Sequence, residues 1–209
     1  MEKIRVCFVT NELDHGNFPP TGGIGVFIKT LSENLYKNGI DVHILGFNGK
    51  NSTSSKDGVN LKTIHLGKIE NINTIIDLID NTFILKNILR VSKVFKFFKI
   101  KYYKKIAETV KAYSTANNIN IIEFNDYLGY GAYMDKNKNY SIVIRLHGSK
   151  TVLNSIYKIK EDSDIKFFEK KAIENSDILI AVSKFSKEQA KNEFNIKKDI
   201  EICYNGVNI

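Results

Sequence analysis

Residues 4–37 have the sequence IRVCFVTNELDHGNFPPTGGIGVFIKTLSENLYK, the stretch that decides the fold. Its first seven residues are an apolar run with the length and branched side chains of a buried strand. A turn with Gly22, Gly23 and Gly25 follows and opens a predicted helix that runs to Lys37, where Asn38-Gly39 is a typical helix stop. Its predicted apolar side consists of Val26, Phe27, Leu31 and Leu35. The succession of strand, glycine turn and helix predicts the first unit of an α/β protein.

Six more apolar runs of strand length follow along the chain, with longer helical patterns between most of them. The seven predicted strands are residues 4–10, 41–47, 61–66, 119–124, 141–147, 177–182 and 200–204. Alternating strands and helices predict an α/β fold with a doubly wound, mostly parallel, Rossmann-like sheet of about seven strands. The segment 48–58 is polar and aperiodic, and is therefore predicted to be an exposed loop.

A long insert, residues 71–116, is predicted to be mostly helical. Apolar residues recur in it at spacings of three and four, which indicates one apolar helix face. These residues are Ile84, Ile88, Val91, Phe95, Phe98, Tyr102 and Ile106. Between Lys86 and Lys105, lysines alternate with aromatic residues, so the helix has two interpretations. It packs its apolar face on the sheet with its lysines in solvent, or it also lies on an anionic membrane surface.

Composition sets limits on class and on partners. The chain has 209 residues, of which 43% are hydrophobic, enough for one large domain. Its net charge of +8 favours anionic partners such as nucleotide phosphates or an acidic membrane. It has no glycine-lysine phosphate loop and no aromatic RNA-binding signature, so a nucleic-acid partner is not expected.

The sequence also predicts the cellular setting. The chain shows neither a signal peptide nor an apolar run of the roughly 20 residues that cross a bilayer, so we expect a cytoplasmic protein with at most peripheral contact at the inner face of the membrane. Cys7 and Cys203 each lie in an apolar run, and we expect both to be reduced and buried.

A binding crevice is predicted where the winding of the sheet reverses. In a doubly wound sheet this point lies between the first and the fourth predicted strands, and ligands bind beyond the carboxyl ends of the strands there. Three segments should therefore converge: residues 11–25, 125–131 and 147–150.

Each candidate residue in these segments has a functional and a structural interpretation. The turn with Gly22, Gly23 and Gly25 lets a diphosphate approach helix amides, or is only a tight connection. His147 ends a strand within Arg-Leu-His-Gly-Ser and is expected to point into the crevice. In the functional interpretation, Asp126 binds a sugar hydroxyl or accepts a proton. In the structural interpretation, it stabilises a turn or caps a helix. Capping is the preferred role of Ser183.

Together, these positions resemble the N-terminal domain of the GT-B glycosyltransferases of family 4. The matching stretches are PTGGIG (20–25), IIEFND (121–126), RLHG (145–148), EKKAIENSDILIAVS (169–183) and NGVN (205–208). The resemblance implies that residues 1–209 are the N-terminal, acceptor-side half of a GT-B fold. It also implies that the C-terminal, donor-binding domain is absent from this chain, which should be inactive alone.

The same resemblance implies transfer of a sugar from a nucleotide-diphosphate donor to a hydroxyl of a glycan or lipid-linked acceptor, with retention of configuration and with no metal or other cofactor. The resemblance also implies three roles. His147 would be the catalytic residue, which positions the transferred sugar and supports it electrostatically. Gly22, Gly23 and Gly25 would lie beside the donor diphosphate, and the acceptor side would include Asn11, Asp126 and Tyr127. Glu161 and Glu169 have the family's E-x7-E spacing without its glycine context, so we interpret that match as accidental.

Two other classes of function compete with the transferase. A non-catalytic module would use the same crevice to bind an acceptor or a partner domain and the basic helix to dock on a membrane. A dinucleotide-dependent oxidoreductase is disfavoured, because the first turn is not G-x-G-x-x-G and the second predicted strand ends in Gly46-Phe47-Asn48 without an acidic residue for a ribose.

Overall fold

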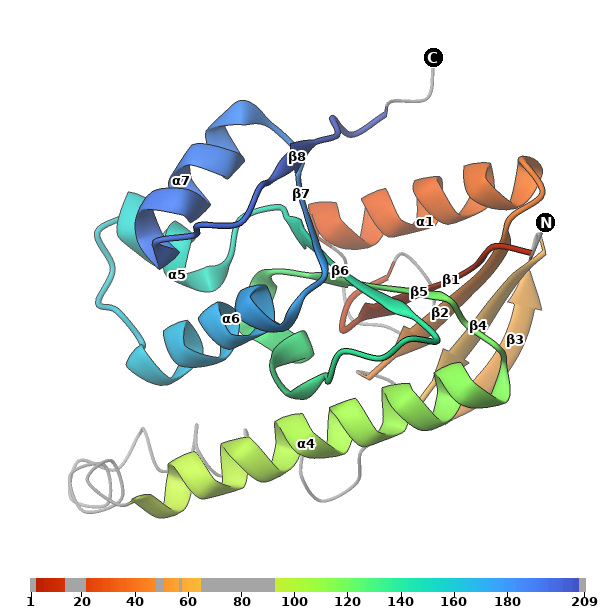
Figure 1. Cartoon of the computed structure of the whole chain (residues 1–209), viewed down its shortest axis with the longest axis horizontal. Helices are drawn as coiled ribbons and strands as arrows, with labels where there is room; N and C mark the ends of the chain where they lie inside the picture. The colour runs from red at the N-terminus through yellow and green to blue at the C-terminus, as the bar shows by residue number, and fades with distance from the viewer. Residues whose placement is uncertain (1–2, 14–21, 48–50, 57, 65–92, 207–209) are drawn as a thin grey trace.

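The computed structural model describes residues 3–13, 22–47, 51–56, 58–64 and 93–206. Within these ranges, eight strands form one sheet in the order β3-β4-β2-β1-β5-β6-β7-β8 (Figure 1). The strands are β1 (Arg5–Thr10), β2 (Asp41–Gly46), β3 (Ser52–Lys56), β4 (Val59–Thr63), β5 (Ile121–Asn125), β6 (Ser141–Leu146), β7 (Ile178–Ala181) and β8 (Glu201–Ile202). The helices are α1 (Gly23–Lys37), α4 (Lys93–Ala116), the 3-10 segment η2 (Tyr127–Tyr133), α5 (Lys150–Ile156), α6 (Ser163–Asn175) and α7 (Lys184–Phe194).

The predicted α/β fold with a mostly parallel sheet is confirmed. Every neighbouring pair of strands is parallel except β3 with β4. The first strand, β1, lies between β2 and β5, so the winding reverses between β1 and β5, as predicted. The crevice segments therefore belong to adjacent strands.

The prediction of a loop over residues 48–58 was wrong for Ser52–Lys56, which form the edge strand β3. This strand runs antiparallel to β4, with Ser52 opposite Thr63, and the two hydroxyl oxygens lie 2.7 Å apart. An edge strand has one hydrogen-bonded neighbour and need bury neither face deeply. The apolar alternation that reveals inner strands was therefore absent.

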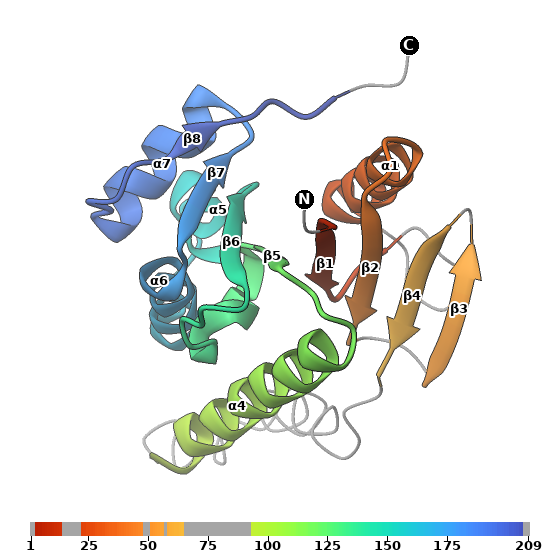
Figure 2. The same cartoon turned by 45° about the vertical axis from the view of Figure 1, so that its right-hand side comes forward.

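Helices cover both faces of the sheet (Figures 1 and 2). Along β1, side chains alternate between two apolar clusters, as the pleat requires. Val6 and Phe8 join the cluster that α1 covers, whereas Cys7 and Val9 join the larger cluster under α4, η2 and α6. This two-sided burial explains why the inner strands are continuous apolar runs.

The boundaries of α1 and its stop at Asn38-Gly39 are confirmed, but one residue of its predicted apolar face is not buried. Val26 is 52% exposed, while Ile28, which lies two residues later and so on nearly the opposite side of the helix, is buried. Phe27, Leu31 and Leu35 pack against the same apolar cluster as Ile28, so only Val26 was assigned to the wrong side of α1. The capping role of Ser183 is also confirmed, because its hydroxyl accepts a hydrogen bond from the Ser186 N–H at the start of α7.

The apolar stripe predicted for the insert is only partly correct. Ile84, Ile88 and Val91 lie outside the described residues, and Phe98 is 41% exposed. The buried face of α4 consists of Tyr103, Ile106, Ala107 and Val110. Positions spaced by four drift around a helix of 3.6 residues per turn, so a stripe built on that spacing leaves the buried face.

Phe97 and Phe98 are exposed, and the Lys101 ammonium lies 6.0 Å from the centre of the Phe97 ring. This surface has the character that the membrane hypothesis requires, and the contact itself stays a prediction. None of the helices in the described ranges has the length and apolar character needed to span a bilayer.

Both cysteines have free thiols, and Cys7 is buried as predicted. The predicted burial of Cys203 was wrong, since this residue is exposed. It follows the two-residue edge strand β8, which leaves its neighbours open to solvent.

Candidate functional site

The carboxyl ends of β1, β5 and β6 lie side by side, with Val9 beside Phe124 and Asn125 beside Arg145. His147 follows β6 directly and meets α1 across this edge. Its ring contacts the Phe27 ring edge-on, with ring centres 4.8 Å apart, and the Arg145 guanidinium lies 5.1 Å from the centre of the same Phe27 ring. The structure therefore brings the described parts of the predicted segments together.

A buried ion pair lies behind His147. The Arg145 guanidinium donates two hydrogen bonds to the Glu123 carboxylate, at 2.6 and 3.1 Å, and both residues are buried. A bidentate pair of this kind fixes a positive charge rigidly, because both of its hydrogen bonds must break for it to move.

The His147 imidazole is half-buried and electrically neutral at ordinary pH. Burial, and then the positive charge of Arg145, lower its pKa from 6.5 to about 4. A neutral imidazole donates or accepts hydrogen bonds but is a weak base. This charge state suits the predicted positioning role, which stays a prediction.

Asp126 is turned inward at the end of β5. Its carboxylate accepts hydrogen bonds from the backbone N–H of His147 at 3.0 Å and of Gly148 at 3.2 Å, and the residue is 2% exposed. Its side chain does not cap η2, so the helix-cap part of the structural interpretation was wrong, while its hydrogen bonds to two backbone amides are a structural role. Its carboxylate instead ties the end of β5 to the loop after β6, and its predicted contact with an acceptor stays a prediction.

Burial raises the pKa of Asp126 to about 7, and the nearby negative charge of Glu169 adds to this effect. The carboxyl therefore keeps its proton in the folded chain over a range in which an exposed aspartate is ionised. Because the neutral form is favoured by folding, the free energy of unfolding decreases as the pH rises from about 4 to about 7.

Asp126→Asn is accordingly expected to gain stability relative to the wild type as the pH rises. Asparagine does not titrate and keeps an oxygen that can accept from the His147 N–H. The opposite trend caused by His147 is common to both proteins and cancels in the difference. Urea unfolding between pH 4 and 8 should show the difference moving in favour of the variant by on the order of a few kcal/mol. Parallel curves would contradict this, and exposed Asp135→Asn is the matched control.

The glycine turn is occupied by a carboxylate of the chain itself. The Gly25 N–H donates to Glu12 Oε1 at 3.0 Å, and the Glu12 backbone is held by the Thr10 hydroxyl. A side chain added at Gly22 would place its Cβ 3.1 Å from Glu12 Oε2. Glu12 thus supplies the negative charge that the N-terminus of α1 attracts.

The other predicted acceptor residues are placed at the same edge. Asn11 follows β1 and Tyr127 opens η2, and both are partly buried. Asn125, which was not singled out from the sequence, is 5% exposed, and among the residues that the structure describes neither polar atom of its amide has a hydrogen-bond partner. Buried polar groups without partners cost about 1–3 kcal/mol and often mark functional sites.

Sequence reasoning missed Glu12 and Glu169, although each holds part of the predicted site. Both signals were weak: Glu12 lies one residue after a predicted site residue, and Glu169 was considered only for its E-x7-E spacing with Glu161, which we interpreted as accidental. Within the described ranges, no three His, Cys, Asp or Glu side chains gather as a metal site would require.

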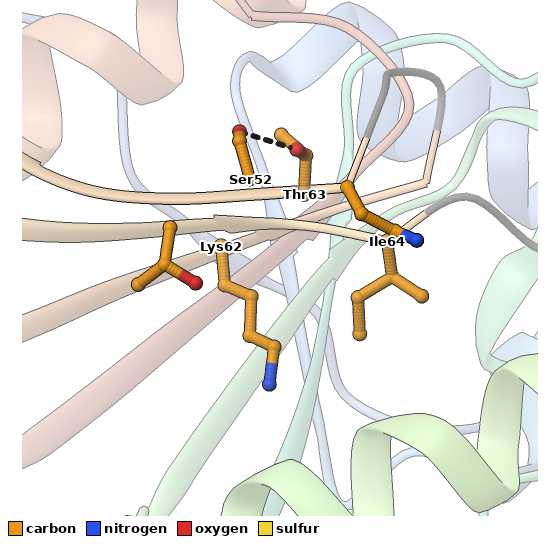
Figure 3. Close-up of a pocket in the computed structure, with 6 residues that line it drawn as sticks. Ser52, Lys62, Thr63 and Ile64 are labelled. Carbon is orange, nitrogen blue, oxygen red and sulfur yellow. Dashed lines mark hydrogen bonds between the residues drawn. The ribbon is translucent and has the colours of Figure 1, made fainter.

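A shallow hollow at the far edge of the sheet is lined by Ser52 of β3, Lys62 and Thr63 of β4, and Ile64, which follows β4 (Figure 3). The crevice residues are not among those that line it. The candidate site is therefore defined by the carboxyl ends of the strands and the polar groups there, and this hollow is not part of it.

A mostly parallel sheet whose first helix starts at a glycine defines a Rossmann-like α/β domain, and the comparisons with known proteins identify it as one half of a GT-B fold. The chain belongs to glycosyltransferase family 4, whose model matches residues 21–209. A structure of sucrose-phosphate synthase from Thermosynechococcus elongatus has the same fold, with a TM-score of 0.52 and 13% identity over 98% of this chain and 89% of that one. No curated protein sequence matches the chain.

Proposed function

We propose that this domain is the N-terminal, acceptor-side half of a retaining glycosyltransferase. Its substrates would be a nucleotide-diphosphate sugar and a hydroxyl of a glycan or a lipid-linked acceptor, and a second, C-terminal domain would hold most of the nucleotide. The observation that carries the proposal is that the neutral His147 ring packs against Phe27 of α1, while its backbone N–H is held by the Asp126 carboxyl, at strand ends next to the point where the winding reverses.

The charges at this edge suit a reaction without a strong protein base. In the retaining mechanism that we propose, the acceptor attacks on the face from which the phosphate leaves, and the leaving phosphate takes the proton. Asp126 has its carboxyl turned toward backbone amides, and His147 is a weak base. Stabilisation of the departing diphosphate by helix amides would then provide most of the catalytic effect.

The proposal is tested with an enzyme that contains this domain and a donor-binding second domain. A panel of UDP- and GDP-sugars, each offered with polysaccharide and glycolipid acceptors, is assayed for nucleotide release. Release that requires one sugar donor and an acceptor supports the transferase. A folded enzyme that releases nucleotide from no donor would favour a module that only binds its ligands.

Glu12→Gln is expected to strengthen donor binding, because the Glu12 carboxylate lies on the turn proposed for the diphosphate. An amide removes the repulsion between two anions, and a charge at a helix terminus is worth about 0.3–1 kcal/mol. We expect the KM for the donor to fall about three- to fivefold, while thermal stability falls slightly because α1 loses its counter-charge.

Steady-state kinetics and thermal unfolding measure the two effects. Glu33→Gln, near the other end of α1, is the matched control and should change neither quantity. An unchanged or higher donor KM in Glu12→Gln would show that the diphosphate does not bind at this turn.

A further inference from the structure

Glu169 lies in the middle of α6 and is completely buried. Its carboxylate accepts hydrogen bonds from three backbone N–H groups: those of Leu128 at 3.0 Å, Lys150 at 2.8 Å and Thr151 at 3.1 Å. Within the described part of the chain, no lysine or arginine forms an ion pair with it. Burying a carboxylate costs several kcal/mol unless its oxygens are well satisfied, so this arrangement must fix its surroundings closely.

The three amides belong to, or directly follow, two of the three segments that form the crevice. Leu128 lies two residues after Asp126, and Lys150 lies three residues after His147. Asp126 already joins the two segments directly through the N–H groups of His147 and Gly148. Two buried carboxyl groups therefore hold five backbone amides, and Glu169 joins the same two segments a second time.

The contact at Leu128 holds the backbone in a strained conformation. Leu128 has φ of 64°, a left-handed conformation that costs a non-glycine residue roughly 1–2 kcal/mol. Its N–H donates to Glu169, and its carbonyl oxygen accepts from the Tyr103 hydroxyl of α4. Two hydrogen bonds from different helices thus hold one strained residue, which indicates that the path of the chain here is closely determined.

The contact at α5 has a similar effect. Ser149 caps this helix by accepting from the Val152 N–H, and α5 has no acidic residue in its first turn. Glu169 supplies that negative charge from α6 by accepting from the first two amides of α5. The start of α5, and with it the loop that carries His147, is therefore fixed to α6.

We propose that Glu169 is a positioning residue for His147: its carboxylate holds the turn after β5 and the start of α5 so that the imidazole stays packed against Phe27. The inference deepens the proposed function and rests on it for the role of His147. The positioning itself is a property of this domain and can be measured without turnover.

The test is an NMR titration of the histidine rings in the wild type and in Glu169→Gln, which keeps the volume of the side chain and removes its charge. Loss of the clamp should let solvent reach the ring, so the pKa of His147 rises from about 4 toward 6.5. His43, whose ring bonds to Tyr113 at a distance from the loop, should keep its lowered pKa. Exposed Glu174→Gln, on the same helix, is the matched control.

A folded Glu169→Gln in which the pKa of His147 stays near 4 overturns the proposal. Should this variant not fold, hydrogen exchange in the wild type decides. The amides of Leu128, Lys150 and Thr151 should all be protected at least about a hundredfold, and exchange at unprotected rates overturns the proposal.

In the two-domain enzyme, Glu169→Gln should lower kcat several-fold and leave the donor KM within about twofold, because Glu169 does not touch substrate. Unchanged kcat together with a shifted pKa of His147 would refute the link to catalysis. If no donor supports turnover in the wild type, the proposed function fails, while the titration still tests the clamp.

Discussion

Turnover of the two-domain enzyme is expected to fall at least about tenfold in His147→Ala, roughly 1.4 kcal/mol of barrier. The imidazole is neutral, with a pKa of about 4, and packs against Phe27 of α1 at the edge where the transferred sugar is proposed to lie. Its loss removes a hydrogen-bonding group that would act on the sugar in the transition state, so kcat should fall more than the donor KM rises.

His147→Asn is the matched variant for this prediction, because it keeps one donor and one acceptor close to the backbone. It should retain more activity than His147→Ala if hydrogen bonding to the sugar is what matters. Circular dichroism and urea unfolding check that both variants fold. Wild-type kcat in a folded His147→Ala would remove His147 from the proposed mechanism.

Gly129→Ala is expected to have the largest effect on stability, at least about 4 kcal/mol, and to prevent folding in a marginally stable chain. Gly129 has φ of 67°, and a Cβ there would lie 2.5 Å from the Glu169 nitrogen and 2.5 Å from the Phe168 carbonyl carbon. These are backbone atoms of α6, so the clash cannot be relieved by a change of rotamer. Either η2 or α6 must move.

Gly39→Ala separates this clash from simple backbone strain. Gly39 has φ of 82°, but a Cβ there meets no atom within 4 Å. It should therefore lose only about 1 kcal/mol, the usual penalty for an alanine in the left-handed region. Urea unfolding of the two variants measures both values. Similar losses would show that η2 does not pack against α6 as closely as described.

Strands and helices with one-dimensional apolar patterns could be predicted from the sequence. The inner strands are covered on both faces and appear as continuous apolar runs, so β1, β2 and β5 to β7 were predicted, together with the reversal between β1 and β5. The edge strand β3 buries little, and its Ser-Thr-Ser-Ser-Lys sequence has no such pattern. Pattern therefore predicted the framework and missed its polar edge.

The site was predicted in outline for a different reason. The ends of parallel strands must meet at one edge, so His147 and Asp126 could be placed together before their contacts were known. No pattern shows that Glu169 reaches Leu128, 41 residues earlier, or that Glu12 turns back onto Gly25. Such contacts depend on side-chain directions in the packed fold.

The most direct test of the proposed function is the anomeric configuration of the product that the two-domain enzyme forms from an α-linked nucleotide sugar, determined by NMR before the product can equilibrate. An α-linked product is expected, because the acceptor would attack on the face from which the phosphate leaves. A β-linked product would contradict the proposed function, since inversion requires attack from the opposite face and a protein base that accepts the proton of the acceptor hydroxyl.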